Sequence, residues 1–140
     1  MDRSEQILQE IVSICEGLGV PVDLDRVQPV DDSECPRFVV RTGEEQLDPP
    51  EGARPETVGR RWMMLPQVEF YNAGSDPAAL RTTNVQMWSN FRAAFFQSPV
   101  LEMLSHGTLP AIERNMTSPS QHPNVSGFFI DLALTFDRRD

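Results

Sequence analysis

Apolar residues recur at helical spacing in two long segments of the chain. Arg3–Leu18 carries a single apolar face, and Asp2 before it stands where a helix-capping residue is expected. Asp76–Gln97 carries a stripe rich in large aromatic residues and begins with an aspartate that suits an N-cap. The pattern therefore predicts two amphipathic helices, and a shorter helix is expected over 99–104.

Alternation of apolar and polar residues, the pattern of a half-buried strand, marks three other segments. They are residues 35–42, 60–71 and 128–139. Pro66 predicts a bulge or a sheet edge within the second of them, because proline cannot donate a hydrogen bond to a ladder. The connection over 20–32 leaves room for a short edge strand.

The order of these elements, helix, two strands, helix and strand, predicts an α+β fold. We expect one domain over residues 1–140, with a mostly antiparallel sheet of about four strands and two helices on one face. The length of 140 residues allows a core of useful size. The residues expected to fill that core are Ile11, Phe38, Val40, Trp62, Val68, Phe70, Trp88, Phe91, Phe95, Ile130, Leu132 and Leu134.

Two long segments show neither the helical spacing nor the strand alternation. They are an arm over 43–59, between the first two expected strands, and a loop over 107–124. Loops of such length are uncommon in small domains and are often functional. We interpret 43–59 as a hairpin arm that reaches a neighbouring subunit, and a solvated hairpin tip is the alternative. The residues expected at a subunit or tube interface are Arg37, Arg41, Glu44, Glu45, Glu51, Arg54, Glu56, Arg60 and Arg61.

The charge balance narrows the range of partners. With 21 acidic and 12 basic residues, the chain has a formal net charge of −9 and is repelled by phosphate backbones and anionic membranes. It could still line a channel through which DNA passes. Because no secretory signal and no membrane-spanning apolar run is evident, Cys15 and Cys35 are expected to stay reduced in a cytoplasm.

The candidates for chemistry are few. His106 and His122 are the only histidines, and no acid lies at ligand spacing from either, so we expect no metal site and no cofactor. A Ser-His-Asp triad could be assembled only from Ser105 or Ser126 with His106 and Asp131, which leaves a small hydrolase as a weak alternative. A small adaptor that binds a peptide by strand addition is a further alternative.

Three motifs follow one another in an order known from one family. They are "ECPRFVVRTGEEQ", "RRWMMLPQVEFYNAGSDPAAL" and the closing "FFIDLALTFDRR", with a charged hairpin arm between the first two and an amphipathic helix before them. This layout resembles the tail terminator family of long-tailed phages. The resemblance covers nearly the whole chain.

The resemblance implies a structural virion protein and not an enzyme. Family members assemble as hexameric rings on the last ring of the tail tube, end its growth and present a surface to the head-side connector. The implied partners are copies of itself, the tail tube protein, a sheath protein where there is one, and the connector. The implied location is the tail or neck of a virion assembled in the host cytoplasm, and a neck or head-tail adaptor role is the neighbouring alternative.

Overall fold

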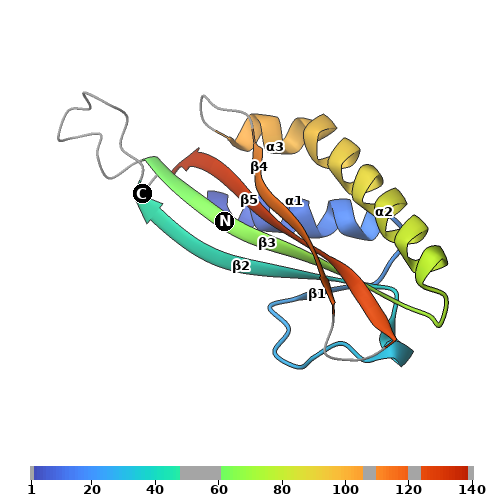
Figure 1. Ribbon diagram of the computed structural model, residues 1–140. Coiled ribbons are helices and arrows are strands. Elements are labelled where there is room, and N and C mark those ends of the chain that lie inside the picture. The colour runs from blue at the N-terminus through green and yellow to red at the C-terminus, as the bar shows by residue number, and fades with distance from the viewer. Residues whose placement is uncertain (1, 48–60, 106–109, 120–123, 139–140) are drawn as a thin grey trace.

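The computed structural model describes residues 2–47, 61–105, 110–119 and 124–138. The chain forms, in order, helix α1 (Arg3–Gly17), strand β1 (Val22–Leu24), a short 3-10 helix η1 (Asp32–Glu34), strands β2 (Arg37–Leu47) and β3 (Arg61–Ala73), helices α2 (Pro77–Gln97) and α3 (Pro99–Leu104), and strands β4 (Ala111–Pro119) and β5 (Val125–Asp137). The three helices cover one face of the sheet (Figure 1). The α+β fold class is confirmed.

The sheet has the strand order β1-β2-β3-β5-β4, with β1 parallel to β2 and every other neighbouring pair antiparallel. The short edge strand foreseen within 20–32 is therefore β1. Strand β4 was not foreseen, and the expectation of a loop throughout 107–124 is wrong for Ala111–Pro119. Of the described strands, β4 pairs with β5 alone. A register shift between Ile112 and Arg114 breaks its alternation, so its sequence lacks a continuous period of two.

The first five residues of the expected arm are also strand, because β2 continues to Leu47 opposite Trp62. A bulge between Arg41 and Glu44 separates the two halves of β2. Gly43 lies there with a φ of +68°, and a Cβ on it would approach the carbonyl oxygen of Leu65 to 2.0 Å. The extra residue exchanges the faces of the following side chains, so the alternation seen before Arg41 does not continue. The rest of the arm, 48–59, lies outside the described residues.

The core fills the space between the sheet and the helices. Its centre is a group of phenylalanines, in which Phe38 and Phe70 have ring centroids 5.0 Å apart and Phe70 stacks on Phe128 at 5.3 Å. Of the side chains expected in the core, those buried are Ile11, Phe38, Val40, Val68, Phe70, Phe91, Phe95, Ile130, Leu132 and Leu134.

The two tryptophans differ from the expectation and are only partly buried at the margin of the core. Trp88 presents its ring to Phe128 at a centroid distance of 6.0 Å, and the guanidinium of Arg92 lies over its other side at 5.6 Å. Trp62 lies under the guanidinium of Arg138, 4.8 Å from its ring centroid. Both rings contact the core while an arginine covers them on the solvent side.

Candidate interaction surfaces

The face of the sheet opposite the helices is partly covered by the connection between β1 and β2 (Figure 1). Arg26 of this connection donates hydrogen bonds to Asp23 at 2.8 Å and to Glu34 at 2.7 Å. Arg37 at the start of β2 donates to the other oxygen of Asp23 at 3.1 Å. The hydrogen bond from Arg26 holds the pKa of Glu34 below its ordinary value. These four side chains form a closed charge network within one chain.

A second group on this face joins β2 to β3. Arg41 donates to both oxygens of Glu69 and also to the backbone carbonyl of Arg26 at 2.6 Å, while the hydroxyl of Tyr71 donates to Glu69 at 2.6 Å. Burial, followed by the hydrogen bond to Glu69, raises the pKa of Tyr71 well above its ordinary value. Glu69 is only 8% exposed, although it lies on the face of the sheet opposite the helices. The covering connection explains why this carboxylate is buried with two donors around it.

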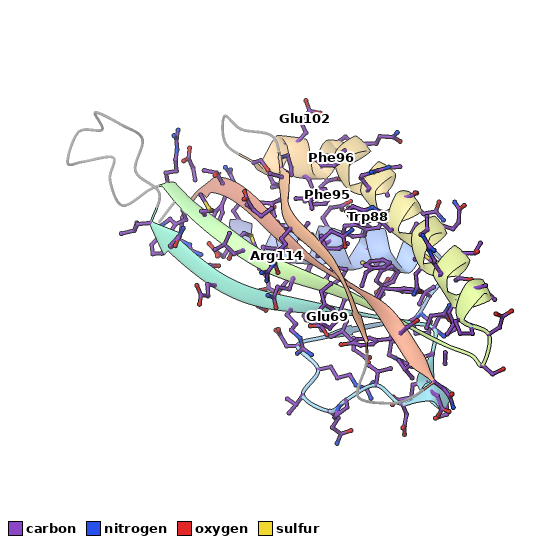
Figure 2. The ribbon with its side chains drawn as sticks, viewed as in Figure 1. Glu69, Trp88, Phe95, Phe96, Glu102 and Arg114 are labelled. Carbon is purple, nitrogen blue, oxygen red and sulfur yellow. The ribbon has the colours of Figure 1, made fainter. Side chains whose placement is uncertain are left out.

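Further along the same face, one carboxylate links three neighbouring strands. Asp131 of β5 accepts hydrogen bonds from Gln67 of β3 at 3.0 Å and from Arg114 of β4 at 2.9 Å. Figure 2 labels Arg114 on β4 and Glu69 on β3. This part of the face is more open than the part beside β2, since the Arg114 side chain is 66% exposed.

Within the described part of the chain, Ser126 and Asp131 of the triad considered from the sequence are not brought together. Ser126 accepts a hydrogen bond from Asn84 of α2 at 3.2 Å, whereas Asp131 lies on the opposite face of the sheet. The two residues are five positions apart in a strand that pairs regularly with β3, so their side chains point to opposite sides. His106 lies outside the described residues.

At the other end of the sheet, Arg138 joins three elements. Its guanidinium pairs with Asp2 at 3.0 Å before α1 and with Glu45 at 2.8 Å on β2, and it also lies 5.2 Å from the ring centroid of Phe136. The hydrogen bond from Arg138 is the main reason why the pKa of Asp2 falls to about 2. Arg138 was not among the interface residues expected from the sequence, although it lies within the strand expected over 128–139, where the alternation gives it the same face as Phe136.

The residues expected at a subunit interface therefore have different surroundings. Arg37, Arg41 and Glu45 form ion pairs within their own chain. Glu44 is exposed, and Arg61 is half-buried with no hydrogen-bond partner for its Nε among the described residues. The positions that lie outside the described residues are Glu51, Arg54, Glu56 and Arg60.

Features of a small-molecule site are weak in the described part of the chain. No group of three or more His, Cys, Asp and Glu residues there could hold a metal ion. A hollow of about 480 Å³ is bordered by Asp23, Arg26 and Glu34, but these charged groups already pair with one another. No helix in the ranges described is both long and apolar enough to cross a membrane.

Comparisons with known proteins give remote likenesses only. No protein-family model matches the chain, and no curated protein sequence does. One similar solved structure, whose name states no function, is 11% identical with a TM-score of 0.47, over 94% of this chain and 96% of that one. Another, from the virion of a native gene transfer agent particle, is 13% identical with a TM-score of 0.43, over 98% of this chain and 92% of that one. Likenesses at this level assign neither a family nor a function.

Proposed function

We propose that this protein is a non-catalytic structural component of a phage-like virion. In the more specific form of the proposal, copies form a ring at the head-proximal end of a tail, end tube growth and join the tail to the head connector. The sequence layout that resembles tail terminators supports the proposal, and so does the α+β fold, in which helices cover one face of the sheet.

The observation that carries the proposal is the state of the sheet edges. Among the strands that the structure describes, β4 pairs with β5 on one side only, and β1 covers β2 only beside Phe38–Val40. Along Gly43–Leu47 the outer side of β2 therefore faces no other described strand. Open edges of this kind must be solvated or covered, and in a ring each subunit can cover its neighbour's edge.

The charges of the hairpin narrow the interface expected from the sequence. Because Arg37 and Arg41 already pair with Asp23 and Glu69, using them between subunits would require breaking those pairs. We therefore place the arm's contacts at Glu44, Arg61 and the charged positions within 48–60.

The test is to replace residues 48–59 by a tight turn that joins β2 to β3. Loop-closure entropy changes by only about 0.6 kcal/mol for each doubling of loop length, so the melting temperature should stay close to that of the wild type. If the arm is an assembly device, the shortened protein should fail to cap tubes of tail tube protein, measured as tube length by electron microscopy.

A matched control keeps the arm's length and removes the charges within 48–59, by Asp48→Asn, Glu51→Gln, Arg54→Gln and Glu56→Gln together. Failure of both variants would show that the charges matter, and failure of the shortened variant alone would show that length does. Normal capping by the shortened variant would rule out the arm's role. A wild-type protein that binds a head connector but ignores tubes would favour the neck adaptor instead.

A further inference from the structure

Helix α2 exposes a surface whose composition differs from that of the whole chain. Pro77–Gln97 contains no Asp or Glu, although the chain has a net charge of −9. Its exposed side includes Arg81, Val85, Arg92 and Phe96, of which Val85 is 56% and Phe96 54% exposed. Protein interfaces are enriched in aromatic residues and arginine and depleted of acidic residues, and this surface shares that composition.

These four side chains lie along one side of the helix, because they follow one another at steps of four, seven and four residues. We name them the arginine stripe. Arg81 and Arg92 are eleven residues apart, which is about three turns and about 16.5 Å along the axis. Neither forms an ion pair with another described residue. Figure 2 shows Phe96 on α2 beside Phe95, whose ring is buried.

Helix α1 exposes a stripe of opposite charge with the same spacing. Glu5, Gln9 and Glu16 are exposed along one side, and Glu5 and Glu16 are also eleven residues apart. Glu10 lies more than a quarter-turn around the helix from them and accepts a hydrogen bond from Ser98, between α2 and α3. The side that carries Glu5 and Glu16, named here the glutamate stripe, therefore points away from the chain's own α2–α3 junction.

We propose that the arginine stripe of one copy binds the glutamate stripe of the next. The equal spacing lets two Arg–Glu pairs form together, with Val85 between the arginines packing on the stretch of α1 around Gln9. The two stripes are different surfaces, so the contact is head-to-tail and produces a ring when the rotation between copies closes. This inference rests on the proposed ring, and it identifies a subunit contact in the helical layer that does not involve the arm.

The test is a charge exchange in the full chain. One variant combines Arg81→Glu with Arg92→Glu, a second combines Glu5→Arg with Glu16→Arg, and a third carries all four substitutions and so keeps the wild-type net charge of −9. Self-association is measured by sedimentation velocity. If copies associate only on tail tubes, the fraction of tubes that carry the protein at their end is measured instead. The first two variants should weaken association by about tenfold or more, and the fourfold variant should restore it.

Two controls separate this contact from general effects of charge. Glu102→Arg reverses another exposed acid, on α3, and should leave association unchanged. Val27→Asp alters a side chain that is 95% exposed in the connection between β1 and β2, and it should also leave association unchanged. Thermal melting confirms that every variant is folded.

Wild-type association in both double variants would overturn the inference and leave the proposed ring intact. Loss of association that the fourfold variant does not restore would also overturn it, because the charges would then face some other partner. A wild-type chain that forms no oligomer in solution or on tubes would overturn the inference and the ring together.

Discussion

Gly127 allows β3 and β5 to approach closely near the start of β5. It lies opposite Tyr71, and an added Cβ would lie 1.6 Å from the carbonyl oxygen of Phe70 and 2.8 Å from its carbonyl carbon. Backbone atoms cannot move away as the end of a flexible side chain can, so Gly127→Ala must push the two strands apart locally. The same shift would disturb the stacked rings of Phe70 and Phe128.

Overpacking of a core commonly costs about 1 to 3 kcal/mol, and stretched ladder hydrogen bonds place Gly127→Ala at the upper end, about 3 kcal/mol. At this chain length 1 kcal/mol corresponds to about 3 °C, so the melting temperature should fall by about 10 °C. Circular dichroism melting measures the fall, and urea titration gives the free energy of unfolding.

The matched control is Gly17→Ala, at the last residue of α1. No atom lies within 4 Å of a Cβ built there, and alanine suits a helix better, so this variant should gain about 0.5 kcal/mol. Opposite signs for two identical substitutions would confirm the close approach at Gly127. A Gly127→Ala variant that melts within about 2 °C of the wild type would refute the reasoning.

Three other predictions follow from burial and charge. Phe91→Ala should lower the free energy of unfolding by about 3 to 5 kcal/mol in urea titration, and Trp88→Ala should lower it clearly less. The reason is that the Phe91 ring is fully buried and the Trp88 ring only in part. Equal losses for the two variants would contradict this prediction. The pKa of Asp2 is lowered to about 2, so its ion pair stabilises the fold above pH 4, and this stabilisation is lost as the pH falls from about 4 to about 2. The difference in stability between the wild type and Asp2→Asn should therefore vanish over that range. Burial raises the pKa of the Cys15 thiol far above its ordinary value, so a thiol reagent should modify the half-buried Cys35 first and Cys15 only on unfolding, as mass spectrometry would show.

The helices could be predicted from the sequence because their periodicity is long and uninterrupted. The start of α2 illustrates this, since Asp76 caps the helix through the Ala78 amide at 3.0 Å, with Pro77 in the first turn. Asp2 also stands at the N-cap of α1, but its side chain makes no capping hydrogen bond and pairs with Arg138 instead. A local pattern identifies the position but does not show which partner the side chain chooses.

The strands were harder to predict wherever a bulge interrupts the alternation. In β2 the bulge after Arg41 exchanges the two faces, so Glu44 and Glu45 looked like loop residues although they continue the ladder. In β4 the bulge around Ile112 and pairing on one side only leave a polar sequence with no continuous period. Both strands are defined by pairing with the next strand of their hairpin, β3 for β2 and β5 for β4, and not by an alternation of their own.

The charge networks depend on contacts between distant positions, which a single sequence does not reveal. Arg41 and Glu69 are 28 residues apart, and Arg138 and Asp2 are 136 apart. The sequence analysis grouped the hairpin arginines by their common charge and expected them to meet another subunit. The fold instead gives Arg37 and Arg41 partners within the chain, so charge alone did not distinguish internal pairs from an interface.

The division between paired and unpaired arginines bears directly on how copies would assemble. Arg37, Arg41 and Arg138 each hold parts of their own chain together, so an interface that used them would have to break existing ion pairs. Arg81 and Arg92 are exposed on α2 and form no ion pair with a described residue, so a neighbour's carboxylates can reach them without that cost.

A ring held by both the arm and the helices should therefore weaken in two independent steps. Combining the shortened arm with Arg81→Glu and Arg92→Glu should add the two losses of association free energy, and a combined loss no greater than either alone would mean that one of these contacts does not exist.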